Sequence, residues 1–215
     1  MSNRTTRGLA AAAVTTAVAL GGSMVAAPGA QAATSERAAK PTSLAQVLAA
    51  DGHHFDHNWG DFDILDKAVM TVLKEKPNSA VGVLAQPRTK LTAFLPTDRA
   101  FRKLVGVLTG SKPKTERKVF TKLAGAAGVD TIEQVLLYHV VPGKTLNAAK
   151  VVKADGMRLT TAQGGTVKVN VRKDGVHLGD AARSVKNPKV IATDVNKGNP
   201  QIAHVINRVL LPIDL

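Results

Sequence analysis

The pattern of apolar residues changes part-way along this chain, and that change restricts the fold more than any other sequence feature. Helical spacing of apolar residues dominates the first half, as in the segment DRAFRKLVGVLTG at 98–110. From about residue 157, short segments rich in β-branched residues take over, and TVKVNVR at 166–172 alternates apolar and polar residues as a strand does. One early strand is expected at 91–95, ahead of a proline, with Leu91, Ala93 and Leu95 on one face and Phe94 on the other. Helices followed by strands predict an α+β fold rather than regular strand–helix alternation.

Helix starts are marked by residues that accept hydrogen bonds from free backbone N–H groups. Ser43 is expected to cap a short helix through Leu48, and Asp61 or Asp63 a second helix that ends near Pro77. The sequence Asp130-Thr131-Ile132-Glu133 has the spacing of a capping box and predicts a new helix there. The C-terminal stretch 202–212 is expected to form two strand-like runs.

The N-terminus has the layout of a secretory signal peptide. Arg4 and Arg7 precede an apolar run that ends near Leu20, and small residues follow as far as Ala32. We expect a signal peptide over 1–32, a disordered lead-in over 33–41 and a single domain over 42–215. The protein is then secreted, and extracellular or associated with the cell envelope. The apolar run is too short and too rich in alanine for a membrane span.

Charge and cysteine content narrow the classes of partner. The signal segment carries two arginines and no acidic residue, so its removal lowers the formal net charge from +13 to +11. An anionic envelope polysaccharide suits this charge, whereas few aromatic residues and an extracellular location argue against nucleic acid. The alternative is that the charge only maintains solubility. With no cysteine, the chain forms no disulfide and depends on its core.

Three segments occur in a familiar order: TAFLPTDRAF at 92–101, VLLYHVVPGKTL at 135–146 and IAHVINRVLLP at 202–212. Together with the hairpin-like LTTAQGGTVKV at 159–169, they resemble the signature segments of fasciclin-type domains. The resemblance implies a wedge-shaped β-sandwich with flanking helices that serves extracellular adhesion or binding and is not an enzyme. It implies no cofactor, and a monomer is expected. The expected partner is a cell-surface or matrix protein, or an anionic envelope polysaccharide.

The chain departs from the family pattern in its closing segment and before its first motif. Asn199-Pro200-Gln201 stands where the family usually has Asn-Gly, and Asn207 replaces an aspartate. The approach from His53 to Lys90 is longer than usual. These differences leave the predicted fold unchanged.

Tyr138, His139 and Asp98 are the motif positions that the resemblance marks as binding residues. The structural alternative is favoured for each of them. Tyr138 and His139 lie among Leu and Val, which predicts that they point inward and hydrogen-bond there. Asp98 follows Pro-Thr at a helix start, where a carboxylate caps free N–H groups. His204 is likewise expected to face a core partner.

No metal site is expected, and His53 and His57 are the weak candidates for one. Their spacing would place both imidazoles on one face of a helix, as metal ligands require, but Gly52 interrupts such a helix. A pocket near His53–Trp59 in a small-molecule or metal carrier is the alternative function. Phe55 and Trp59 are expected to seal one end of the core.

Catalysis has little support in the sequence. Ser184, Asp180 and His177 occur close together, but no G-x-S-x-G segment accompanies them. We therefore expect a non-enzymatic binding module. The candidates for its cationic face are five residues of one Lys-rich segment: Lys112, Lys114, Arg117, Lys118 and Lys122. The alternative is that they form only the solvated side of a helix.

Overall fold

The computed structural model describes residues 40–50 and 52–214. The predicted signal peptide and most of the lead-in lie outside these residues. Within the described ranges, no helix is both long enough and apolar enough to cross a bilayer.

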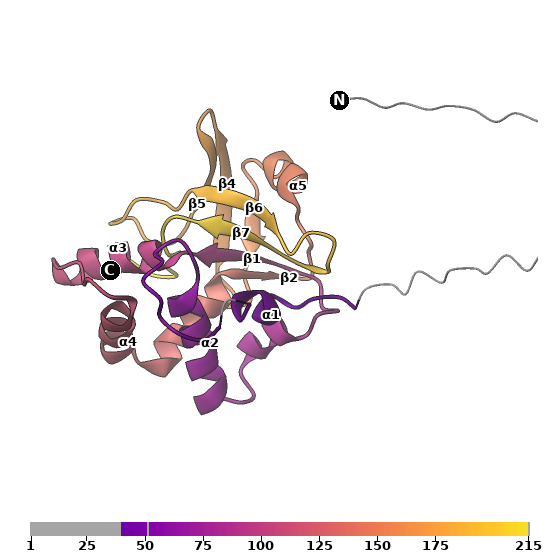
Figure 1. Ribbon diagram of the computed structural model, residues 1–215. Coiled ribbons are helices and arrows are strands. Elements are labelled where there is room, and N and C mark those ends of the chain that lie inside the picture. Colours follow the sequence, from indigo (N-terminus) through magenta and orange to yellow (C-terminus); the bar gives the residue numbers. More distant parts are fainter. Residues whose placement is uncertain (1–39, 51, 215) are drawn as a thin grey trace, which may run out of the picture. The chain divides into compact units, whose positions relative to one another are not determined.

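Helices occupy the first part of the domain and strands the second, which confirms the predicted α+β class (Figure 1). The elements in chain order are α1 (Leu44–Leu48), α2 (Asp63–Glu75), the 3-10 helix η1 (Ala80–Ala85), β1 (Leu91–Pro96), α3 (Asp98–Thr109), α4 (Glu116–Tyr138), β2 (Val140–Pro142), α5 (Ala148–Lys153), β3 (Arg158–Thr160), β4 (Thr166–Arg172), β5 (Gly175–Gly179), β6 (Val190–Val195) and β7 (Gln201–Ile206).

The strands form two sheets. The larger sheet has the order β2-β1-β7-β6, and its two central strands are the first and last strands among the described residues. β1 and β7 pair in parallel, from Leu91 opposite Gln201 to Pro96 opposite Ile206, whereas the outer strands pair antiparallel. The smaller sheet, β3-β4-β5, is an antiparallel meander.

Side chains of β1 enter two separate cores. Leu91, Ala93 and Leu95 pack with α1 to α4, and Phe94 packs on the other face with side chains of the smaller sheet. This confirms the predicted alternation, because successive residues of a strand point to opposite faces. The larger sheet is thus covered by helices on one face and by the smaller sheet on the other.

Local predictions near helix starts were partly wrong. Ser43 does cap α1, in a capping box with Gln46. The N-cap of α2 is Phe62, without a side-chain cap, so neither Asp61 nor Asp63 fills that position. Ile64 in the first turn of α2 instead donates its backbone N–H to Asp98, 3.0 Å away on α3. The cap therefore comes from another helix, which no local pattern indicates.

The predicted capping box at Asp130 is replaced by long-range contacts. Asp130 and Glu133 both bind Nζ of Lys76, and Glu133 also accepts from the hydroxyl of Ser79. The helix pattern nonetheless breaks nearby, because Gly128 within α4 has φ of 70°. Of the two strand-like runs predicted in 202–212, only the first is a strand; residues 209–211 are buried coil.

Candidate functional site

Tyr138 and His139 lie at the junction between α4 and β2. Tyr138 is the last residue of α4 and His139 is its C-cap. Only 1% of Tyr138 and 4% of His139 is exposed. Both side chains are therefore inside the domain, as their apolar neighbours predicted.

Every polar atom of these two side chains has an internal partner. The hydroxyl of Tyr138 donates to the carbonyl of Thr166 at 2.8 Å. Nδ1 of His139 lies 2.7 Å from the carbonyl oxygen of Val135, and Nε2 accepts the N–H of Leu210 at 2.9 Å. Burial lowers the pKa of His139 to about 4. The imidazole is thus neutral and is held in the Nδ1–H tautomer.

Residues that depart from the family pattern also make internal contacts. Gln201 is fully buried, accepts the N–H of Leu44 at 2.7 Å and donates to the carbonyls of Val83 and Gln86. Asn207 accepts the N–H of Lys189 at 2.9 Å. Nothing in the local sequence predicts these contacts, because their partners are distant along the chain.

His204 lies in β7 and is fully buried. Its Nε2 is 2.7 Å from the carbonyl of Leu146, and its ring packs against Phe94 with 6.0 Å between centroids. Burial lowers its pKa. The expected core partner is therefore present.

Asp98 ties two helix starts together. Its carboxylate caps Ile64 of α2, while its own N–H donates to the carbonyl of Asp61, and Arg99 donates to the carbonyl of Trp59. The loop before α2 thus supplies acceptors to α3, and α3 supplies one in return. The prediction that Asp98 caps its own helix is wrong, although a capping role toward α2 remains.

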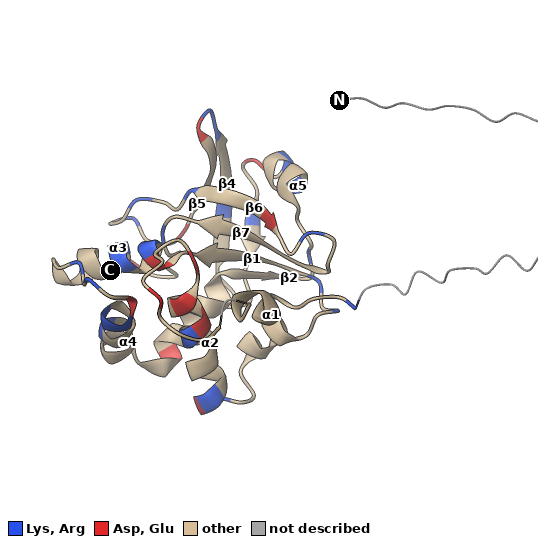
Figure 2. Ribbon diagram, viewed as in Figure 1, with Lys and Arg blue, Asp and Glu red and all other residues tan. Residues whose placement is uncertain are grey.

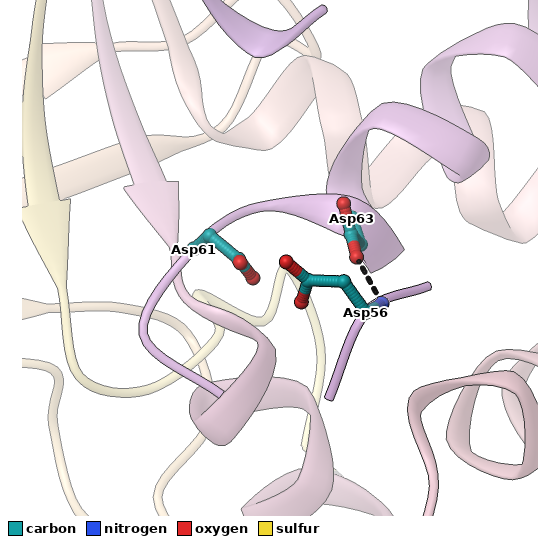
Figure 3. A group of neighbouring side chains, drawn as sticks. All are labelled: Asp56, Asp61 and Asp63. Carbon is teal, nitrogen blue, oxygen red and sulfur yellow. Dashed lines mark hydrogen bonds between the residues drawn. The ribbon is translucent and has the colours of Figure 1, made fainter. Parts of the chain in front are cut away.

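Four further carboxylates gather around this junction. Asp56, Asp61 and Asp63 come from the loop and the start of α2, and Glu116 is the first residue of α4. Figure 3 shows the carboxylates of Asp56 and Asp61 turned toward one another, with Asp63 close by. Oxygens of Asp63, Asp98 and Glu116 lie within 4.8 Å of one another, and all three residues are buried. We call these five residues the carboxylate cluster.

Backbone N–H groups satisfy only part of the cluster. Glu116 accepts from the N–H of His57 at 3.0 Å, and Asp63 accepts from the N–H of Asp56 at 3.1 Å. The second oxygens of Asp98 and Glu116, Oδ2 and Oε1, are buried and receive no N–H or hydroxyl donor. Burial, together with the neighbouring Asp61 and Glu116, raises the pKa of Asp98 to about 9.

The two histidine candidates for a metal site do not converge. Residues 53–58 are not helical, and His57 has φ of 78°, so the one-face arrangement does not form. His53 contacts Asp66 at 2.7 Å instead. Phe55 and Trp59 are half-buried against the first core, and arginines 117 and 102 lie over their rings.

The three candidate catalytic residues, His177, Ser184 and Asp180, each contact a different partner and not one another. His177 contacts Asp174, and Ser184 contacts Asp214. Asp180 accepts the N–H of Leu211 at 2.9 Å. Ser, His and Asp here form no nucleophile–base relay in the described part of the chain.

Basic residues collect on the outside of α3 and α4, whereas acidic ones surround the start of α2 (Figure 2). All five residues of the predicted Lys-rich segment are exposed. A group that shares Lys112 with this segment comprises Arg99, Lys103, Lys112 and Arg208. We call this group the basic face. Burial and the three other members of the basic face lower the pKa of Lys103, which shows that these cations lie close together.

The structure contains an apolar cavity of about 420 Å³, but none of residues 53–59, where a pocket was predicted, lines it. It is bounded by α2, α3, α4 and the C-terminal segment. Its apolar lining includes Leu65, Phe101, Phe120, Val135 and Leu211.

The fold and its inward-facing Tyr-His pair define an α+β domain built on a mixed central sheet. The sequence profile of the Fasciclin domain matches residues 67–212. Because this match covers more than half of the chain, the protein belongs to the fasciclin family. Domains of this family are adhesion and binding modules, typically extracellular or at the cell surface.

One similar solved structure is a FAS1 domain pair from the insect cell adhesion molecule Fasciclin I. The two chains are 18% identical with a TM-score of 0.45, over 67% of this chain and 44% of that one. This chain thus spans less than half of that structure's length. No curated protein matches the sequence.

Proposed function

We propose that the protein is an exported, non-enzymatic binding module that recognises an anionic polysaccharide or a cell-surface or matrix protein through its exterior. The motif pair Tyr138-His139 holds the interior together and does not touch the partner. Its burial supports this assignment, because every polar atom of the pair is occupied within the domain.

The basic face is the observation that carries the proposal. Cations placed close together repel one another and, at partly buried positions, also pay a desolvation cost. Lys103 is subject to both effects, and the one acceptor of its ammonium among the described residues is the carbonyl of Asn207, at 3.1 Å. A polyanion laid across Arg99, Lys103, Lys112 and Arg208 relieves this repulsion. Clustered cations of this kind suit sulfate or carboxylate groups on a polymer.

The test measures binding of the full chain to immobilised heparin, used as a polyanion probe, across a range of salt concentrations. The double variant Arg99→Gln/Lys112→Gln is expected to bind several-fold more weakly and with a smaller salt dependence. The control variant Lys144→Gln/Lys168→Gln removes the same number of charges from exposed positions outside the basic face. It should bind nearly as strongly as the parent protein. Binding that is unchanged between low and high salt contradicts the electrostatic mechanism.

A second candidate function, an extracellular carrier, is supported by the apolar cavity. Its volume lies within the range of small-molecule pockets, and its lining is almost wholly apolar. An apolar molecule, rather than a metal, suits such a lining. Native mass spectrometry of the protein purified from its producing cells tests this: a bound mass that is lost in Phe120→Trp, a variant that fills the cavity, supports it. An unliganded mass throughout contradicts it.

A further inference from the structure

The carboxylate cluster gathers more acidic oxygens than the protein satisfies. It unites the loop at 56–61 with the first residues of α2, α3 and α4: Asp63, Asp98 and Glu116. Helix N-termini attract carboxylates, which explains why single acidic residues stand there. One oxygen of Asp98 accepts the N–H of Ile64 in the first turn of α2, and one oxygen of Glu116 accepts the N–H of His57 in the loop.

Two oxygens remain unexplained. Asp98 and Glu116 are both 0% exposed, and Oε1 of Glu116 has no hydrogen-bond partner. Oδ2 of Asp98 receives no N–H or hydroxyl donor, and the carboxyl of Asp98 lies against that of Asp61. A buried carboxylate oxygen without a donor carries a large desolvation cost. Within the described ranges, neither residue forms a salt bridge. The arginines nearby in sequence, Arg102 and Arg117, lie over the rings of Trp59 and Phe55 instead.

We propose that the carboxylate cluster is a calcium site, with Asp63, Asp98 and Glu116 as its central ligands and Asp56 and Asp61 at its outer side. The spacing suits the ion. Calcium takes oxygens at about 2.3–2.6 Å, so two ligands on opposite sides of it stand roughly 5 Å apart. The ligand oxygens here lie within 4.8 Å of one another, and one ion among them reaches all three residues.

The ligand chemistry selects calcium among common cations. Only carboxylates gather here, without histidine or cysteine, which favours a hard cation over zinc. Magnesium demands a near-octahedral shell and keeps several waters, whereas calcium accepts irregular cages made by the protein. The exposed Asp56 beside the buried ligands gives the ion an entry from solvent.

Thermal unfolding of the full chain, stripped with a chelator, tests the site. Calcium is expected to raise the melting temperature in a saturable way, because a ligand that binds only the folded state stabilises it. Sodium chloride of equal ionic strength should not raise the melting temperature. Asp98→Asn and Glu116→Gln keep the size of each side chain and are expected to weaken calcium binding roughly tenfold or more. Asp174→Asn, an exposed acidic residue elsewhere, should leave the shift intact.

Terbium luminescence provides a second readout that does not depend on stability. Trp59 is the chain's single tryptophan and lies within the loop that carries Asp56 and Asp61. Terbium in the site should therefore emit on tryptophan excitation, and calcium should displace it. Trp59→Phe should abolish the emission but keep the calcium-induced melting shift. Absence of both signals in the parent chain, or full retention of both in Asp98→Asn and Glu116→Gln, overturns the proposal.

Discussion

Nε2 of His139 accepts a hydrogen bond from the backbone N–H of Leu210 at 2.9 Å. The opposite nitrogen of the same ring donates to the carbonyl of Val135 at 2.7 Å. A single imidazole therefore joins the end of α4 to the segment that follows β7. Its geometry requires the neutral form, since protonated Nε2 cannot accept a hydrogen bond.

Replacing His139 by alanine is expected to destabilise the domain without removing recognition. The change leaves the N–H of Leu210 and the carbonyl of Val135 buried without their partner, at a cost of about 1–3 kcal/mol. Differential scanning calorimetry should show a lower melting temperature, and heparin binding measured well below that temperature should be unchanged. His54→Ala removes an exposed imidazole and serves as the control. Loss of binding by folded His139→Ala contradicts the interior role.

The buried imidazole also predicts a loss of stability in acid. The pKa of His139 is about 4 in the folded protein and about 6.5 when unfolded, so the unfolded chain binds the proton more readily. Its contribution is fully present above pH 6.5 and is lost as the pH falls toward 4, by about 3 kcal/mol. Denaturant titrations at several pH values measure this.

Other groups titrate in the same range, so the measurement needs a difference between variants. Burial raises the pKa of Asp180 to about 6, so its contribution is present below pH 3.8 and is lost as the pH rises through 6. The two effects oppose each other between pH 4 and 6. The loss of stability in acid that belongs to His139 is therefore read as the difference between Asp180→Asn and the double variant Asp180→Asn/His139→Gln. Parallel curves for these two proteins would refute the prediction.

Gly165 is predicted to be required for the placement of Tyr138. A Cβ at position 165 would lie 2.9 Å from Cε2 of Tyr138 and 2.9 Å from Oε1 of Gln163. The ring is fixed by its bond to Thr166 and by the second core, so Gly165→Ala should cost roughly 1–3 kcal/mol through overpacking. Gly125→Ala, in α4 with open space around the added carbon, should be neutral or stabilising. Equal melting temperatures for the two variants would contradict this.

Gln201 is predicted to hold the N-terminal part of the domain in place. Gln201→Ala would leave the N–H of Leu44 and the carbonyls of Val83 and Gln86 without this partner. We expect a loss of at least about 2 kcal/mol. Hydrogen exchange should show residues of α1 and η1 losing protection first. Gln134→Ala, at an exposed position, is the control; uniform protection in both variants would contradict the role.

The sequence predicted the framework because periodicity and short motifs are local. Alternation in β1 correctly separated Phe94 from its neighbours, and Ser43 marked the start of α1. Partners distant in the chain were not predictable in this way. Asp98 caps α2 rather than α3, and Asp130 and Glu133 bind Lys76 rather than their own helix. In each case the residue type signalled an acceptor at a helix start, but only the packing of helices selected the donor.

The carboxylate cluster was missed for the same reason. Its members come from four segments, whereas the spacing of the neighbouring histidines is visible in the local sequence. The sequence features that could have indicated the cluster are the three aspartates between Asp56 and Asp63 and the acidic first residues of two helices, Asp98 and Glu116.

The parallel pairing of β1 with β7 has a consequence for how the polypeptide is made. On the ribosome β1 emerges well before β7, its parallel neighbour, because Leu91 pairs with Gln201, 110 residues further along the chain. A nascent chain that stops before Gln201 has an open strand edge in the middle of its future sheet, and such edges promote aggregation. Completion of the sheet therefore waits for synthesis of β7, and contacts between such distant segments make folding slow.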